Sequence, residues 1–262
     1  ILMGCEHEGI HIETSSVIIR MLDSQYLTDN GQWPSFPVTH SAPSKALRNE
    51  LVPVSAKEIR LGKPTNNDTY GWDNEYGISD VFVADFKASK TLVSNQEFMQ
   101  FVDAGGYQAP TYWTDEGKEW LAYTKASMPR FWSFTNGHYM QRNLLHDVPL
   151  PLSWPVEVNY LEAKAFCNWK SAQLKGFVRL PSEAEWQVMR DTLRSDLPTW
   201  EQAPGNINLE HYASSCPVDT FEQGEFYDII GNVWQWSESL IDGFDGFKVH
   251  PLYDDFSTPT FD

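Results

Sequence analysis

Large aromatic side chains are the feature that most limits how this chain can fold. Phe, Trp and Tyr make up 14% of its 262 residues, with 11 Trp among them. Rigid rings of this size are stabilised by burial against other side chains, which requires a closely packed interior. The 16 Gly and 16 Pro interrupt the chain often enough to keep helices and strands short. The composition therefore predicts an irregular, loop-rich fold held together by large buried side chains.

The first 50 residues separate into a helix and a linker. Residues 1 to about 22 place Ile10, Val17 and Ile18 at helical spacing, although no N-capping residue precedes them. The segment "NGQWPSFPVTHSAPSK" (30–45) has the Gly, Pro and Ser content of a linker. We therefore expect one helix at the start of the chain, joined by an irregular segment to a larger body.

From about residue 51 the pattern mixes strands and helices. Alternation between apolar and polar residues predicts strands over 79–89 and 229–239. Capping residues before amphipathic runs predict helices, which begin at Ser94 or Asn95, near residue 159 and after Ser182.

The net charge of −17 restricts the binding partners. So acidic a surface repels nucleic acid phosphates and anionic lipid, so we expect neither nucleic acid nor membrane as a partner. Three widely spaced cysteines without a C-x-x-C pair do not form a disulfide framework, and they favour a reducing, cytoplasmic setting. Because the chain starts without Met and inside an apparent helix, we expect it to be a fragment.

The segment "HEGIH" (7–11) places two histidines one helical turn apart. Residues four apart in a helix lie about 40° from each other, so the imidazoles of His7 and His11 can bind one metal ion. Glu13 lies about 200° around the helix from His11 and cannot reach the same metal. We expect Glu13 to accept hydrogen bonds, for example from a histidine of a neighbouring helix.

The same five letters match the H-E-x-x-H signature of zinc proteases, with Glu8 as the general base. That reading requires a third ligand further along the chain. The long form of the signature needs glycine at position 14 and histidine at position 17, where Thr14 and Val17 stand. The form with a later acid finds only Asp29, in the expected linker. The sequence therefore disfavours a protease.

Five segments, in this order, resemble the formylglycine-generating-enzyme-type domain, which has a C-type-lectin-like α+β fold. They are "GWDNEYG", "TLVSNQEFMQFVDAGGY", "PVEVNYLEAKAFCNWKSAQ", "RLPSEAEWQ" and "GNVWQWSES", spread over residues 71 to 239. Most of their residues have a structural explanation. We expect Trp186, Trp234 and Trp236 to be buried, and Arg179 to form an ion pair with Glu183 or Glu185.

The segment "HEGIHIET" before this domain is similar to the non-haem iron sulfoxide synthases of ergothioneine and ovothiol biosynthesis. In that family a DinB-like helical bundle supplies a three-histidine iron site. The stretches "MGCEHEGIHIETSSVIIRML" and "HPLYDDFSTPTFD" look most like the ovothiol branch, 5-histidylcysteine sulfoxide synthase. The resemblance divides the chain into the last helix of the DinB-like domain (1–24), a linker (25–50) and the formylglycine-generating-enzyme-type domain (51–262), incomplete at its C-terminal end.

The resemblance implies a ligand set and a reaction. His7 and His11 would bind Fe(II) together with a third histidine from before Ile1, and O2 would be the co-substrate. Neutral imidazoles leave the ion its positive charge and open positions. Tyr253, in "YDDFS", matches the tyrosine that supplies a proton beside the iron. The substrates would be cysteine and histidine, and a methyltransferase domain is expected in the full-length chain.

Three alternatives stay open. An ergothioneine-type enzyme would use hercynine in place of histidine, but Ile10 stands where that branch tends to have a glutamine. A formylglycine-generating enzyme would act on a sulfatase cysteine, without the upstream histidine helix. A non-catalytic lectin-like module would bind its ligand without a metal on His7 and His11. On the preferred reading the isolated fragment is inactive, because substrate contacts are missing from it.

Overall fold

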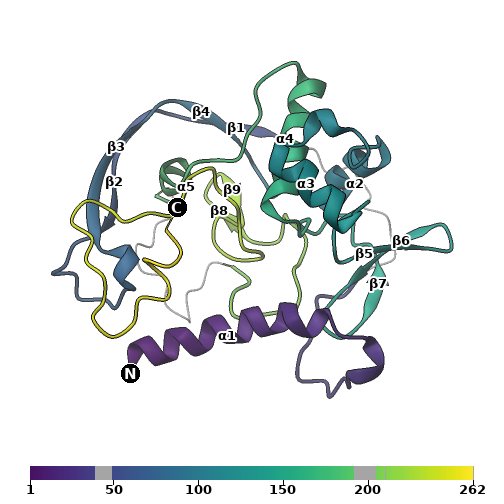
Figure 1. Ribbon diagram of the computed structural model, residues 1–262, viewed down its shortest axis with the longest axis horizontal. Helices are drawn as coiled ribbons and strands as arrows, with labels where there is room; N and C mark the ends of the chain where they lie inside the picture. The colour runs from purple at the N-terminus through teal and green to yellow at the C-terminus, as the bar shows by residue number, and fades with distance from the viewer. Residues whose placement is uncertain (39–48, 192–204, 210, 262) are drawn as a thin grey trace.

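The computed structural model describes residues 1–38, 49–191, 205–209 and 211–261. Helix α1 (Leu2–Arg20) confirms the predicted first helix and is followed by the short 3-10 helix η1 (Ser24–Tyr26). Figure 1 shows α1 as a long straight helix running along one side of the body, with the C-terminal loop close to its N-terminal end. Within the described ranges, no helix combines the length and the apolar character needed to cross a membrane.

The strands of the body form small separate sheets. In the described residues all pairings between named strands are antiparallel: β1 (Leu51–Val54) with β4 (Phe86–Ser89), β2 (Lys57–Lys63) with β3 (Gly77–Val83), β5 (Trp132–Thr135) with β6 (His138–Arg142), β6 with β7 (Asp147–Pro149), and β8 (Glu222–Gln223) with β9 (Phe226–Tyr227). The prediction of one strand over 79–89 was wrong in its continuity. The run breaks after Val83 because its two halves, β3 and β4, pair with different strands.

The helices of the body begin where the capping residues predict. Helices α2 (Asn95–Asp103), α4 (Tyr160–Leu174) and α5 (Glu183–Arg190) each start with a capping box, in which the side chains of the N-cap and of a Glu bond each other's backbone N–H. The remaining helical elements are η2 (Asp73–Glu75), η3 (Pro110–Tyr112) and α3 (Asp115–Thr124). This mixture of short helices and small sheets confirms the predicted α+β character.

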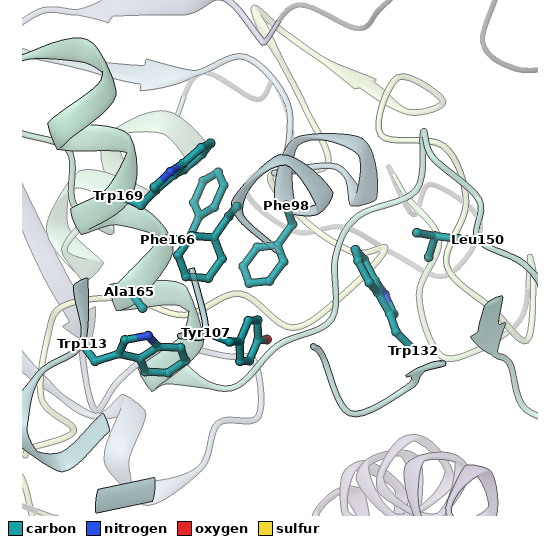
Figure 2. Close-up of a cluster of buried hydrophobic side chains, with 9 residues drawn as sticks. Phe98, Tyr107, Trp113, Trp132, Leu150, Ala165, Phe166 and Trp169 are labelled. Atoms are coloured by element: carbon teal, nitrogen blue, oxygen red, sulfur yellow. The ribbon is translucent and has the colours of Figure 1, made fainter. Parts of the chain in front are cut away.

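The main core is the aromatic interior that the composition predicts (Figure 2). Phe98 of α2 stacks on Phe166 of α4, with ring centroids 5.3 Å apart, and Phe101 is fully buried beside them. Gly106 lies against this core, because a Cβ there would come 2.2 Å from the Phe101 ring. The aromatic rings thus fix α2 and α4 to each other and make a rigid support for the loops around them.

Two expectations for residues 229–239 were wrong. The structure has no strand over this segment, although all its residues are described. Trp234 and Trp236 are 70% and 50% exposed, whereas Trp186 is half-buried. Both exposed indoles use their N–H groups in hydrogen bonds, to Glu13 of α1 and to the Val158 carbonyl. The two indoles therefore lie at the surface, and Trp234 bonds to α1.

The described part of the expected linker lies against the body. The Phe36 ring packs edge-on against Trp154 and Tyr212, and its backbone N–H donates to Ser214. The Ala213 N–H donates to the Pro34 carbonyl. Residues 39–48 of the linker lie outside the described residues, and the predicted domain boundaries stay a prediction.

Candidate functional site

His7 and His11 converge on one side of α1. Their Nε2 atoms are 3.2 Å apart and their ring centroids 4.3 Å apart. Two nitrogens bound to one metal ion at about 2.1 Å, with an angle of 90–110° between the bonds, are about 3.0–3.4 Å apart. The distance between the two nitrogens therefore fits a shared metal ion. The same distance also suits a hydrogen bond between two neutral imidazoles, in which one nitrogen donates and the other accepts.

The described residues supply only these two candidate ligands. Among them, no group of three or more His, Cys, Asp or Glu side chains is arranged to hold a metal ion. His146 is engaged elsewhere, with its Nε2 2.9 Å from Asp29, and the Nδ1 of His250 accepts from the Leu252 N–H. The third histidine that the resemblance implies is thus not found in the described part of the chain.

Tyr253 is the predicted acid, and the C-terminal loop brings it to His7. Their ring centroids are 5.7 Å apart at an interplanar angle of 83°, and Phe256 lies 6.3 Å from the same histidine ring. Partial desolvation, together with the charge and hydrogen bond of Asp255, raises the pKa of the Tyr253 phenol above its usual 10. The phenol is therefore protonated at neutral pH and can donate a proton.

Trp72 extends this pair into an aromatic wall. Its ring lies 4.7 Å from Phe256 and 5.8 Å from Tyr253, with Tyr70 behind it at 5.8 Å. Sequence reasoning used "GWDNEYG" only to recognise the fold and missed this role. The four rings thus form a partly buried aromatic cluster beside His7.

Asp73 and Asn74 hold the loop that carries Tyr253. One carboxylate oxygen of Asp73, which is buried, accepts from the His250 N–H at 2.9 Å and from the Ser257 hydroxyl at 2.7 Å. The Asn74 side chain donates to the Phe256 carbonyl at 2.7 Å. These bonds tie residues 250–257 to η2, about 180 residues earlier in the chain, so that Tyr253 faces α1.

Glu13 bonds to the body and not to another helix. Its Oε2 accepts from the Trp234 indole N–H at 2.7 Å, and its Oε1 accepts from the Asn208 backbone N–H at 3.1 Å. The expectation that Glu13 accepts hydrogen bonds is confirmed. In the described residues, however, its partners belong to two loops of the body.

Arg20 fixes the opposite end of α1. Its guanidinium forms two hydrogen bonds with Glu157, of 2.5 and 3.0 Å, and two more with the Arg142 carbonyl. It also lies 3.9 Å above the Phe131 ring. A bidentate, half-buried pair of this kind fixes both position and orientation.

A cleft of about 1370 Å³ separates the C-terminal half of α1 from the body. Its lining begins at Glu13, two residues beyond His11, and includes Val17, Arg20, Trp120 and Tyr212. His7, His11 and Tyr253 are not part of this lining. The cleft therefore adjoins the histidine site along the helix but does not contain it.

The buried cysteines are poor nucleophiles. Burial raises the pKa of Cys167 to about 11 and that of Cys216 to about 12, so both thiols stay protonated at neutral pH. The predicted ion pair between Arg179 and Glu185 is confirmed at 2.5 Å, and it serves the start of α5. Neither feature adds a reactive group to the histidine site.

Comparison with known proteins agrees with this architecture. Residues 38–248 match the sulfatase-modifying factor enzyme 1-like domain. Hercynine oxygenase of Mycolicibacterium smegmatis is 28% identical over 98% of this chain and 59% of its own length. Ergothioneine biosynthesis protein 1 of Neurospora crassa is 22% identical over the whole chain and 38% of its own length. A formylglycine-generating enzyme of Thermomonospora curvata is 23% identical over 77% of the chain and 74% of its own length.

The relatives differ in how much of this chain they cover. The hercynine oxygenase alignment extends over nearly all of this chain, whereas the formylglycine-generating enzyme aligns with about three quarters of it. The chain spans about three fifths of the length of the two Mycolicibacterium hercynine oxygenases it matches. The family match itself covers most of the chain, so this protein belongs to the family of sulfatase-modifying factor enzyme 1-like domains.

Proposed function

We propose that the chain is part of a non-haem Fe(II)-dependent sulfoxide synthase. The reaction uses O2 to join the sulfur of cysteine to the imidazole carbon of histidine, as in ovothiol biosynthesis. The observation that carries the proposal is the meeting of His7, His11 and Tyr253 from opposite ends of the chain. The similarity to a protein named hercynine oxygenase supports an oxygen-using reaction on an imidazole compound. The DinB-like origin of α1 and the lectin-like topology of the body are part of the same proposal.

His7 and His11 are the residues of this chain that would hold the iron. When bound, Fe(II) supplies the one-electron chemistry that O2 and a thiol need to react with each other, which Zn(II) lacks. The Tyr253 phenol, which is protonated at neutral pH, holds a proton beside His7. Trp72 and Phe256 pack against the Tyr253 ring and orient it. Each of these tasks belongs to side chains that the structure brings together.

Hercynine is the second candidate for the imidazole substrate. Two relatives named hercynine oxygenase match nearly the whole chain, which favours it. Ile10, the residue before His11, favours histidine, because the ergothioneine branch tends to have a glutamine there. The two substrates differ by three methyl groups on the amino nitrogen, so mass analysis of a mixture containing both identifies the preferred one.

The test is product analysis with the full-length protein. We expect Fe(II), cysteine, histidine and O2 to give a coupled sulfoxide, detected by mass spectrometry. Formation of cysteine sulfinate alone would reject the reaction. Tyr253→Phe should shift the products toward sulfinate, because the proton donor is lost while the ring remains. Tyr123→Phe is the control, since Tyr123 is 89% exposed on α3. An equal ratio of sulfoxide to sulfinate in wild type and Tyr253→Phe would show that Tyr253 has no role in the reaction.

A further inference from the structure

Helix α1 carries both histidines but is packed weakly. In the described part of the chain none of its residues is buried, and Ile18 is 58% exposed. Burial of apolar side chains is what usually fixes a helix on its neighbours. Within the described residues, α1 is therefore held against the body mainly by polar contacts.

The contacts of Arg20 hold only the C-terminal end of α1, and the histidines lie far from that end. With a rise of 1.5 Å per residue, His7 lies about 20 Å along the helix from Arg20. A tilt of about 5° around Arg20 would move His7 by about 1.7 Å. Displacements of this size separate productive from unproductive geometry in an active site. A second contact nearer to the histidines is required to hold them against Tyr253.

Glu13 is that second contact. It lies about 9 Å along the helix from His7, less than half the distance to Arg20. Its two carboxylate oxygens bind donors from separate loops, the Trp234 indole and the Asn208 backbone. A carboxylate that accepts two hydrogen bonds from different directions resists both tilting and rotation of the helix.

Trp234 has the properties of a positioning residue. It is 70% exposed, so burial does not explain its place in the fold. Its indole N–H nevertheless makes a short 2.7 Å bond to a residue 221 positions earlier. Trp236, two residues on, provides the contrast: it is also half-exposed, but its N–H donates to Val158 within the body.

We propose that Glu13 and Trp234 form a positioning pair, which sets the tilt of α1 and thereby the placement of His7 and His11 against Tyr253. The effect of this pair on the reaction rests on the proposed function. Its structural part concerns only how the helix is held. In this proposal Glu13 acts through the helix and not as an iron ligand.

Trp234→Phe is the decisive variant, with Trp236→Phe as the matched control. Both substitutions keep an aromatic ring and remove one indole N–H, but only the first removes a bond to α1. Glu13→Ala removes both bonds from the helix side. Glu13→Gln keeps one acceptor oxygen and tests partial rescue. Because the altered side chains are exposed or on the surface helix, the variants are expected to fold.

The first measurement is hydrogen–deuterium exchange of the 5–14 region in the full-length, metal-free protein. Loss of one hydrogen bond to a charged acceptor is expected to speed exchange about tenfold in Trp234→Phe, with no change in Trp236→Phe. Glu13→Ala should equal or exceed this effect, and Glu13→Gln should fall between it and wild type. Equal exchange in Trp234→Phe and wild type, or equal effects of both Trp variants, would overturn the pair.

The second measurement is the ratio of sulfoxide to sulfinate under saturating substrates. We expect Trp234→Phe and Glu13→Ala to lower the ratio, with Glu13→Gln partly restoring it. An unchanged ratio beside faster exchange would show that the pair holds the helix without serving the reaction, which contradicts the inference. If the wild-type protein makes no sulfoxide, the proposed function fails, while exchange without metal still decides the structural part.

Discussion

Replacing Asp73 is expected to release the loop that carries Tyr253. One Asp73 oxygen accepts from the His250 N–H and the Ser257 hydroxyl, at 2.9 and 2.7 Å. A hydrogen bond to a charged acceptor contributes about 1.5–3 kcal/mol, and a neutral one about 0.5–1.5 kcal/mol. Taking the lower end for two bonds, Asp73→Ala costs about 3 kcal/mol in the stability of the loop.

That energy corresponds to an increase of about a hundredfold in the population of the open loop, at 1.4 kcal/mol per factor of ten. Asp73→Asn keeps one acceptor oxygen in the same place but makes it neutral. Its two weaker bonds reduce the loss to about 1 kcal/mol, or about fivefold in opening. The structure therefore predicts a graded series in which wild type is most closed, Asn intermediate and Ala most open.

Hydrogen–deuterium exchange of residues 248–258 measures this opening directly. The His250 amide is the most informative probe, because its acceptor is Asp73 itself. Asn74→Ala is a useful companion, since it removes only the bond to the Phe256 carbonyl. If Asp73→Ala left exchange unchanged, or if Asp73→Asn opened the loop as much as Ala, the account of how Tyr253 is positioned would be refuted.

Three further predictions concern the support of the site. Arg179 lowers the pKa of Glu185 chiefly through a side-chain hydrogen bond. The contribution of this pair to the free energy of unfolding is therefore present above pH 4.5 and is lost as the pH falls through the lowered pKa. Arg179→Met should therefore cost about 1 kcal/mol near pH 7 and less as the pH falls through the lowered pKa of Glu185, in urea titrations. Phe101→Ala should destabilise the protein by about 3–5 kcal/mol by calorimetry, whereas Phe134→Ala, at a 56% exposed position, should cost little. Gly106→Ala should lower the melting temperature, because its Cβ would meet the Phe101 ring at 2.2 Å.

Local signals in the sequence predicted local structure well. Ser94 and Ser182 mark helix starts because a capping box depends on residues only three positions apart. His7 and His11 converge because both lie on one helix, where spacing alone determines the geometry. The aromatic composition predicted the kind of core, though not which rings meet.

Features that depend on distant partners were missed or wrong. The run over 79–89 splits because its first half pairs with β2 and its second half with β1. Alternation within the run does not reveal these partners. Trp234 was expected in the core because Trp is usually buried, but its partner, Glu13, lies 221 residues away. Trp72 and Asp73 carry no motif that links them to residues 250–257, so their role at the site became visible only from the fold.

The central claim is that His7 and His11 bind iron facing Tyr253. The most direct measurement is a crystal structure of the full-length protein loaded anaerobically with Fe(II), with anomalous diffraction recorded on both sides of the iron edge. We predict an iron peak bonded to Nε2 of both His7 and His11, on the side of α1 that faces the Tyr253 ring. Iron bound elsewhere, or two imidazoles that remain hydrogen-bonded to each other without iron, would contradict the account.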